Sequence, residues 1–135
     1  RSVKMDYKFP KELKYTVTHE WVLLEDDIAI VGITDFAQHQ LGDIVYVEMP
    51  DIGMVFERES NAGEIESVKA VGEIIIPLSG EIIETNSKVI DNPELVNSSP
   101  FEEGWIMKIK ISHKDEIENL ISVEEYIKVV ESEEA

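Results

Sequence analysis

The segment from Gly63 to Pro77 constrains the fold of this chain more than any other stretch. Its first half contains Glu, Lys and Ala, which favour a helix. However, Gly63 and Gly72 bracket that half too closely for a stable helix, and the following residues 74–76 are β-branched isoleucines. Pro77-Leu78-Ser79-Gly80 then turns the chain. The segment is therefore predicted to be a β-hairpin rather than a helix.

The predicted hairpin has a lysine at its tip. Its first strand runs to about Val68, a tight turn holds Lys69, and a return strand continues to Ile76. Two-residue hairpin turns usually contain Asn-Gly or Asp-Gly, because their central residues need a positive φ. None of these residues occurs in Val68-Lys69-Ala70. Because local rules are most often broken at functional sites, we expect a strained turn with Lys69 as the functional residue.

The rest of the chain reads as short strands with a few helices. Apolar alternation and turn residues predict strands at 15–24, 28–33, 44–49, 81–85 and 105–111. A short helix is expected at 36–41, with Thr34-Asp35 before it and Gly42 after it. Another is expected after Asn92, with Pro93 in its first position. Two more close the chain, the second begun by a capping box of Ser122 and Glu125.

Length and composition fit one domain with a core of its own. The 135 residues are 43% hydrophobic, which is enough for a single globular unit. We expect an N-terminal extension at 1–14, one domain at 15–131 that includes C-terminal helices at 112–131, and an acidic tail at 132–135. No apolar run approaches the roughly 18 residues that a transmembrane helix needs, and no signal peptide is visible.

Charge and cysteine content exclude several functions. With 12 basic and 29 acidic residues, the formal net charge is −17. Nucleic acids and anionic membranes select basic surfaces, so neither is expected as a partner. Zero cysteines exclude disulfides, zinc–thiolate sites and cysteine nucleophiles. Any redox chemistry must therefore come from an attached group.

Several motifs together identify a family. Glu66-Ser67-Val68-Lys69-Ala70 resembles the lipoyl-lysine hairpin of the H proteins of the glycine cleavage system. Further motifs resemble that family in order and spacing, over roughly residues 15–126: Tyr15-Thr16-x-Thr18-His19-Glu20-Trp21-Val22, Gly32-Ile33-Thr34-Asp35-Phe36-Ala37-Gln38, Leu41-Gly42-Asp43-Ile44-Val45, Pro77-Leu78-Ser79-Gly80-Glu81, Asn92-Pro93-Glu94-Leu95-Val96-Asn97 and Gly104-Trp105. The resemblance implies a mainly β fold, the flattened barrel or sandwich of lipoyl and biotinyl carriers, with short helices at the C-terminus.

The resemblance also implies a function and a cofactor. Lipoate would be joined to Lys69 by an amide, and a lipoate ligase or lipoyl transferase would recognise Glu66, Ser67, Val68 and Ala70 around it. The non-catalytic carrier would take an aminomethyl group from the glycine decarboxylase (P protein) to the folate-dependent aminomethyltransferase (T protein). The dihydrolipoamide dehydrogenase (L protein) would then reoxidise it. We expect a monomer in the bacterial cytoplasm, or in the mitochondrial matrix of a eukaryote.

The family shelters its loaded arm in a cleft on the carrier. The positions that match the cleft are Thr18, Glu20, Glu73, Ile33, Phe36 and Leu41. A carboxylate there would hold the ammonium of the cargo by a charge-assisted hydrogen bond. For each of the three apolar positions, core packing is the favoured role and lining the cleft is the alternative.

Alternatives from other classes remain open at this point. The chain could relay lipoyl groups during cofactor assembly, or it could be an unmodified binding module with the same fold. Ser67-x-Lys69 could suggest a serine–lysine hydrolase, although no oxyanion-hole motif accompanies it. His19-Glu20 opens a zinc-protease pattern, but Leu23 stands where the second histidine is required, so no metal site is predicted.

Overall fold

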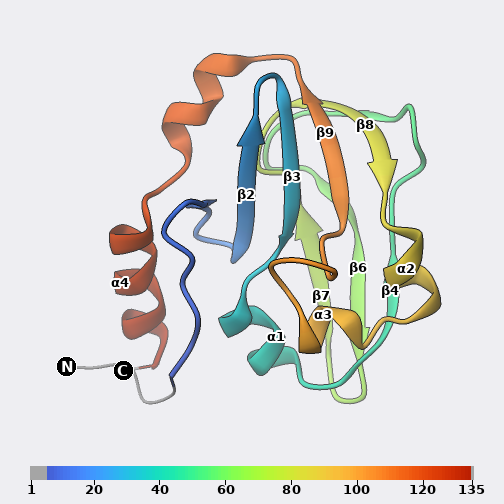
Figure 1. The fold of residues 1–135 in the computed structure, drawn as a ribbon, viewed down its shortest axis with the longest axis vertical. Helices are drawn as coiled ribbons and strands as arrows, with labels where there is room; N and C mark the ends of the chain where they lie inside the picture. Colours follow the sequence, from blue (N-terminus) through green and yellow to red (C-terminus); the bar gives the residue numbers. More distant parts are fainter. Residues whose placement is uncertain (1–5, 135) are drawn as a thin grey trace.

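The computed structural model describes residues 6–134 as two antiparallel sheets with short helices around them (Figure 1). The six-stranded sheet has the order β1-β2-β3-β9-β8-β5 and the three-stranded sheet the order β4-β6-β7. The strands are β1 (Lys14–Tyr15), β2 (Glu20–Glu25), β3 (Ile28–Ile33), β4 (Ile44–Glu48), β5 (Val55–Phe56), β6 (Asn61–Ser67), β7 (Val71–Ile75), β8 (Gly80–Thr85) and β9 (Met107–Ile111).

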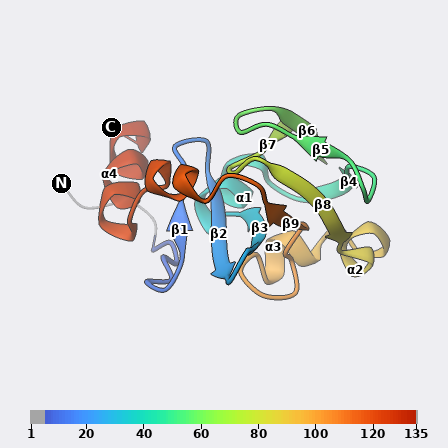
Figure 2. The same cartoon turned by 90° about the horizontal axis from the view of Figure 1, so that it is seen from above.

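Helices occupy the connections and the C-terminus. They are α1 (Asp35–Leu41), α2 (Ser87–Asp91), α3 (Leu95–Ser98), the 3-10 helix η1 (Lys114–Asn119) and α4 (Val123–Glu134). Seen from above, the sheets form two layers, with α4 at one end of the molecule and α2 at the other (Figure 2). No helix in the described range 6–134 has both the length and the apolar character needed to cross a membrane.

Two apolar clusters hold the molecule together. The larger lies between the two sheets and includes Val22, Val31, Ile65, Ile74 and Ile109, all at most 1% exposed. It forms because alternate residues of each strand face the other layer. The smaller cluster is aromatic and fixes α4 and the N-terminal segment to the six-stranded sheet; its buried members are Tyr7, Leu13, Tyr15, Trp21, Phe36, Val123, Tyr126 and Val130.

The expected fold class is confirmed. The chain is mainly β, and its antiparallel sheets pack as a sandwich without closing into a barrel within the described part. The helix at 35–41 begins and ends as expected: the Thr34 side chain accepts a hydrogen bond from the Ala37 backbone N–H, and Gly42 follows with φ 84°. The capping box is also present, with Ser122 N donating to Glu125 Oε1 at 3.0 Å and Glu125 N donating to Ser122 Oγ at 3.2 Å.

Three local expectations were wrong. Asn92 does not begin a helix; it ends α2, whose N-cap is Asn86, and the next helix starts only at Leu95. The expected strand 15–24 is interrupted, because residues 16–19 turn between β1 and β2 and His19 has φ 75°. The strand β5 was not expected, since its two residues carry no periodic signal and pair only with Glu81 and Gly80 of β8.

The structure also differs from the expected boundaries at both ends. Within the proposed extension 1–14, Tyr7 and Leu13 are buried in the aromatic cluster, so this segment packs on the domain from residue 6 onward. Within the proposed tail 132–135, α4 continues to Glu134. Negatively charged side chains are unfavourable at the C-terminus of a helix because of the helix dipole. Here Tyr7 Oη donates a hydrogen bond to Glu134 Oε2 at 3.0 Å, which stabilises the last turn. Residues 1–5 and 135 of the two segments lie outside the described residues.

Candidate functional site

The hairpin β6–β7 carries Lys69 in its connecting turn, as predicted. The hydroxyl of Ser67 organises this turn: it accepts hydrogen bonds from the backbone N–H groups of Lys69 (3.2 Å) and Ala70 (3.0 Å). It also donates to the Ala70 carbonyl at 3.1 Å, next to the backbone bond from Ser67 N to the same oxygen at 2.8 Å. One side chain thus replaces the backbone acceptor that a two-residue turn would use.

The expectation of a strained turn was wrong. Among the described residues, the non-glycine residues with positive φ are His19, Asp26 and Glu59, and none belongs to the hairpin tip. The Ser67 hydroxyl removes the need for a positive φ, because it satisfies the turn's N–H groups from the side. Ser67 is accordingly buried, whereas Glu66, Val68, Lys69 and Ala70 are exposed.

The hairpin tip rests on the connection between α1 and β4. The backbone N–H of Val68 donates to the Asp43 carbonyl at 3.1 Å. The aliphatic stem of Lys69 lies over Gly42, where an added Cβ would stand 3.2 Å from Lys69 Cε. The Lys69 amine is therefore exposed on a turn that is held on one side by the hairpin and on the other by the end of α1.

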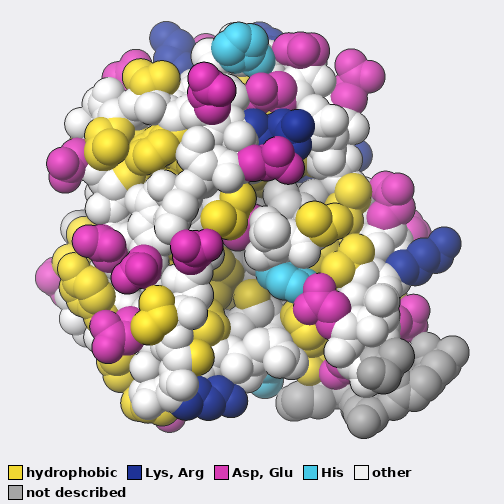
Figure 3. All heavy atoms as spheres, turned by 180° about the vertical axis from the view of Figure 1, so that it is seen from behind, with side chains coloured by type: hydrophobic (Ala, Val, Ile, Leu, Met, Phe, Trp, Pro, Cys, Tyr) yellow, Lys and Arg dark blue, Asp and Glu magenta, His cyan; other side chains and the backbone are white. Residues whose placement is uncertain are grey.

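The six predicted cleft residues line one cleft of about 230 Å³. They come from the β1–β2 turn and β2 (Thr18, Glu20), β3 (Ile33), α1 (Phe36, Leu41) and β7 (Glu73). Five further residues complete its walls: His19, Ala37, Gln40, Ile65 and Gly72. Figure 3 shows a face of the molecule where hydrophobic side chains gather in a hollow beside a histidine.

The cleft lies next to the lysine. Leu41, in its wall, directly precedes the Gly42 over which the Lys69 stem runs. Gly72, three residues after Lys69, lies in the wall as well. An added Cβ at Gly72 would stand 3.3 Å from Leu41 Cδ2, so the absence of a side chain there leaves room between hairpin and helix.

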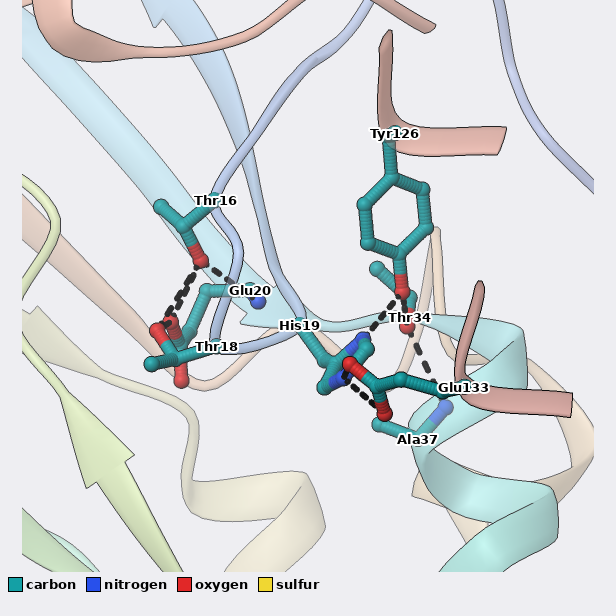
Figure 4. A network of polar contacts seen from close by, with 8 residues as sticks. All are labelled: Thr16, Thr18, His19, Glu20, Thr34, Ala37, Tyr126 and Glu133. Atoms are coloured by element: carbon teal, nitrogen blue, oxygen red, sulfur yellow. Dashed lines mark hydrogen bonds and ion pairs between the residues drawn. The ribbon is translucent and has the colours of Figure 1, made fainter. Parts of the chain in front are cut away.

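Glu20 is the buried carboxyl group of the cleft. It is 1% exposed, and its Oε1 accepts hydrogen bonds from Thr16 Oγ1 (2.6 Å) and Thr18 Oγ1 (2.5 Å) (Figure 4). The backbone N–H of Ile75 approaches Oε2 at 3.4 Å. Burial raises the pKa of Glu20 from its ordinary 4.5 to about 7, although the two threonine hydroxyls act in the opposite direction. Near neutral pH this carboxyl group can therefore be either neutral or charged, and a nearby cation would favour its charged form.

Glu73 differs from Glu20 in its surroundings. It is exposed at the rim, and its Oε2 accepts a hydrogen bond from Asn61 Nδ2 at 2.8 Å. Its strand position is opposite Glu64 of β6. The two carboxyl groups are thus not equivalent, since only Glu20 is shielded from water.

His19 is one of the five cleft residues that the sequence analysis did not assign to the cleft. It lines the cleft, and its ring is held by α4: Nδ1 is 2.8 Å from Tyr126 Oη, and Nε2 is 2.9 Å from Glu133 Oε2 (Figure 4). These partners are 107 and 114 residues away along the chain. No local pattern in the sequence indicates contacts over such a separation.

The structure gives no support to a hydrolase. The Ser67 hydroxyl is engaged by the backbone of its own turn, with Lys69 contributing only its main-chain N–H to that network. A nucleophilic serine would instead need its hydroxyl hydrogen-bonded to a basic side chain. The Ser-x-Lys spacing is therefore explained by turn formation.

Comparison with known proteins agrees with this geometry. A family model described as "Glycine cleavage H-protein" matches residues 13–133. The chain belongs to the glycine cleavage H-protein family. Its relatives in that family include the glycine cleavage system H protein of Halothermothrix orenii, 46% identical over 125 residues, which cover 93% of this chain and 98% of that protein.

Other family members are similarly close. The glycine cleavage system H protein of Bacteroides thetaiotaomicron is 49% identical over 122 residues, covering 90% of this chain and 97% of that protein. The mitochondrial glycine cleavage system H protein 3 of Arabidopsis thaliana is 48% identical over 123 residues, covering 91% of this chain and 74% of that protein. The crystal structure of a glycine cleavage system H protein from Mycobacterium marinum superposes with a TM-score of 0.79 at 31% identity, covering 88% of this chain and 96% of that chain.

Proposed function

We propose that this protein is the lipoyl carrier of a glycine cleavage system, with lipoate attached to Lys69 as an amide. The observation that carries the proposal is the placement of one exposed lysine on a rigid hairpin tip, beside a cleft that contains a buried carboxyl group. A carrier requires this combination, because its cargo must reach partner enzymes and must also be sheltered between visits.

The residues of the cleft fit such an arm. Ile33, Phe36 and Leu41 provide an apolar wall for a hydrocarbon chain, and Gly72 leaves space for it. When bound, the lipoyl group supplies a reactive disulfide that can accept an aminomethyl group and later be reoxidised. The protein itself contributes attachment, positioning and shelter.

Glu20 has the properties needed to hold an amine-bearing cargo. Its burial excludes competing water, and the hydroxyls of Thr16 and Thr18 fix the carboxyl group in place. An ammonium group in the cleft would favour the charged form of Glu20 and would donate a charge-assisted hydrogen bond to its carboxylate. Thr18 helps to hold the carboxyl, while Glu73 offers a second negative charge at the rim.

The partners follow from the carrier role. We expect no catalysis by this chain alone, and we expect glycine decarboxylase (P protein), aminomethyltransferase (T protein) and dihydrolipoamide dehydrogenase (L protein) to use the arm in turn. A lipoate ligase or lipoyl transferase would recognise the hairpin through exposed Glu66, Val68 and Ala70 and the turn shape set by Ser67. In a bacterium the carrier would work in the cytoplasm, and in a eukaryote in the mitochondrial matrix.

Intact mass after co-expression with a lipoate ligase tests the attachment. The wild type should gain one lipoyl group, and Lys69→Arg should gain none while it melts at the same temperature, because Lys69 is exposed. Lys88→Arg is the matched control, since Lys88 is 72% exposed on another element and should leave modification unchanged. A lipoyl mass on the Lys69→Arg variant would disprove the assignment.

A second measurement separates carrier roles. If the lipoylated protein supports glycine cleavage when it is mixed with the three partner enzymes, it is the carrier of that system. If it instead only passes lipoyl groups to other proteins, it is a relay carrier for cofactor assembly. Absence of any modification would indicate an unmodified binding module.

A further inference from the structure

A continuous chain of hydrogen bonds joins the C-terminal helix to the cleft. Thr34 Oγ1 is 2.6 Å from Tyr126 Oη, Tyr126 Oη is 2.8 Å from His19 Nδ1, and His19 Nε2 is 2.9 Å from Glu133 Oε2 (Figure 4). We refer to these four residues as the His19 relay. They join α4, the β1–β2 turn and the start of α1.

The donor and acceptor roles within the relay can be assigned from its ends. A carboxylate only accepts, so His19 Nε2 carries the hydrogen that is donated to Glu133. In a neutral ring Nδ1 is then the acceptor, and the Tyr126 hydroxyl must donate to it. The Tyr126 oxygen in turn accepts from the Thr34 hydroxyl, whose oxygen accepts from the Ala37 backbone N–H at 3.2 Å. With His19 neutral, every member of the relay thus has a defined role, and the ring is held in one tautomer and one orientation.

His19 needs such support because its backbone is strained. Its φ of 75° lies in the left-handed region, which residues other than glycine rarely adopt. Conformations of this kind persist when the surroundings determine them. Here the His19 backbone N–H donates to the Thr16 carbonyl at 3.2 Å, the His19 carbonyl accepts from Thr34 N at 3.1 Å, and the relay holds the side chain.

The strained residue stands between two residues of the cleft wall, the exposed Thr18 and the buried Glu20. Thr18 precedes His19 and donates a hydrogen bond to Glu20 Oε1, and Glu20 follows His19. The Glu20 backbone N–H donates to Thr16 Oγ1 at 3.0 Å within the same turn. A change in the backbone of His19 therefore moves the carboxyl group of Glu20 and its hydroxyl donors together.

We propose that Tyr126 and Glu133 are positioning residues of the carrier cleft, acting through His19 to hold Glu20 and Thr18 in the geometry that retains the cargo of the arm. The inference rests on the proposed function. It makes the C-terminal helix part of the site, although α4 contributes no wall residue to the cleft.

Two variants break the relay at different bonds. Tyr126→Phe removes the hydroxyl but keeps the ring that stacks on Tyr15 at 4.7 Å between centroids. Tyr7→Phe is its matched control, because it also removes a hydroxyl bonded to α4, through Glu134, without touching the relay. Glu133→Ala removes the carboxylate from an exposed position, and Glu133→Gln retains an oxygen that can accept from His19 Nε2.

The first readout uses the lipoylated protein loaded with an aminomethyl group, without partner enzymes. Tyr126→Phe and Glu133→Ala should shorten the half-life of the loaded form by about fivefold, the factor that the loss of one hydrogen bond gives. Tyr7→Phe should leave the half-life unchanged, and Glu133→Gln should have a half-life much closer to that of the wild type than Glu133→Ala has. Lipoylation of Lys69 should be normal in all four. Unchanged half-lives in both relay variants would overturn the proposal.

The second readout needs no lipoate and uses backbone hydrogen exchange by NMR. The N–H groups of Thr34 and Glu20, which bond to His19 O and Thr16 Oγ1, should exchange faster in Tyr126→Phe and Glu133→Ala than in the control. Equal exchange would show that α4 does not hold the turn. Should the wild type fail to be lipoylated, the proposed function would fall, and the exchange data would still decide whether the relay positions Glu20.

Discussion

The side chain of Lys69 lies across Gly42, at the point where α1 ends. A Cβ atom at position 42 would stand 3.2 Å from Lys69 Cε and 3.8 Å from Cδ, and Gly42 has φ 84°. The backbone conformation requires glycine here, and an added side chain would also press on the lysine stem. The helix end therefore forms the surface that supports the stem of Lys69.

Gly42→Ala should impair lipoylation beyond its effect on stability. At φ 84° and ψ −159° an alanine occupies a region essentially restricted to glycine, which lowers the unfolding free energy by about 1–3 kcal/mol. The added methyl group also shifts the Lys69 stem. Gly53→Ala is the control, because Gly53 has φ 98° and nothing lies within 4 Å of its added Cβ. Urea unfolding should show similar losses for both variants, and the rate of lipoylation should fall only for Gly42→Ala.

Ser67→Ala should loosen the hairpin tip. The variant loses the hydroxyl that accepts from the N–H groups of Lys69 and Ala70, so we expect a loss of about 1–2 kcal/mol in unfolding free energy. Lipoylation should become slower because the lysine no longer has one fixed presentation. Ser67→Thr keeps the hydroxyl, and this variant should be lipoylated at a rate close to that of the wild type. Normal modification of Ser67→Ala would indicate that the ligase tolerates a mobile turn.

Glu66→Ala should slow lipoylation without changing the fold. Glu66 is exposed, three residues before the target, and we expect the unfolding free energy to stay within about 0.5 kcal/mol. Glu64→Ala is the matched control, an exposed glutamate two residues earlier on the same strand. Comparison of ligase kinetics should show an effect at Glu66 alone. A large drop in melting temperature with normal kinetics would assign Glu66 a structural role.

Glu20 should make the unloaded protein less stable as the pH rises towards neutrality. Burial raises the pKa of Glu20 from 4.5 to about 7 in the folded state. Between those pH values the folded protein binds more protons than the unfolded chain, so the free energy of unfolding falls as the pH increases from about 4.5 to about 7. Urea titrations across this range should show a smaller fall for Glu20→Gln. Parallel curves for the two proteins would contradict the raised pKa.

Glu20→Gln should also shorten the life of the loaded arm. Glutamine keeps the shape and an acceptor oxygen but removes the charge that would hold an ammonium group. A hydrogen bond to a charged group contributes roughly 1.5–3 kcal/mol, against about 1 kcal/mol for a neutral pair. The half-life of the aminomethyl-loaded protein without partner enzymes measures this difference, while lipoylation and reoxidation should be unaffected. Equal half-lives and equal stability would leave Glu73 as the remaining carboxylate candidate.

Local signals in the sequence predicted the elements whose ends are set by neighbouring residues. Thr34 and Gly42 mark the ends of α1 because their side chain and backbone satisfy the helix termini directly. The hairpin was predicted for a similar reason, since glycines and β-branched residues set the backbone conformation of their immediate neighbours. Such signals failed around Asn92, which was expected to cap the helix that follows it but instead ends α2, while α3 starts only at Leu95. The helix α2 with its N-cap Asn86 was not predicted.

The sequence by itself determined the lysine at the hairpin tip, the mainly β fold and six candidate positions that line the cleft, because these depend on local chemistry and on motifs that identify a family. Only the tertiary structure decided how these residues work together. It buries Glu20 and leaves Glu73 exposed, although the two are the same residue type. It also brings Tyr126 and Glu133 to His19 across more than 100 residues. Burial and long-range hydrogen bonds arise from the packing of α4 and the two sheets, and no short stretch of sequence encodes them.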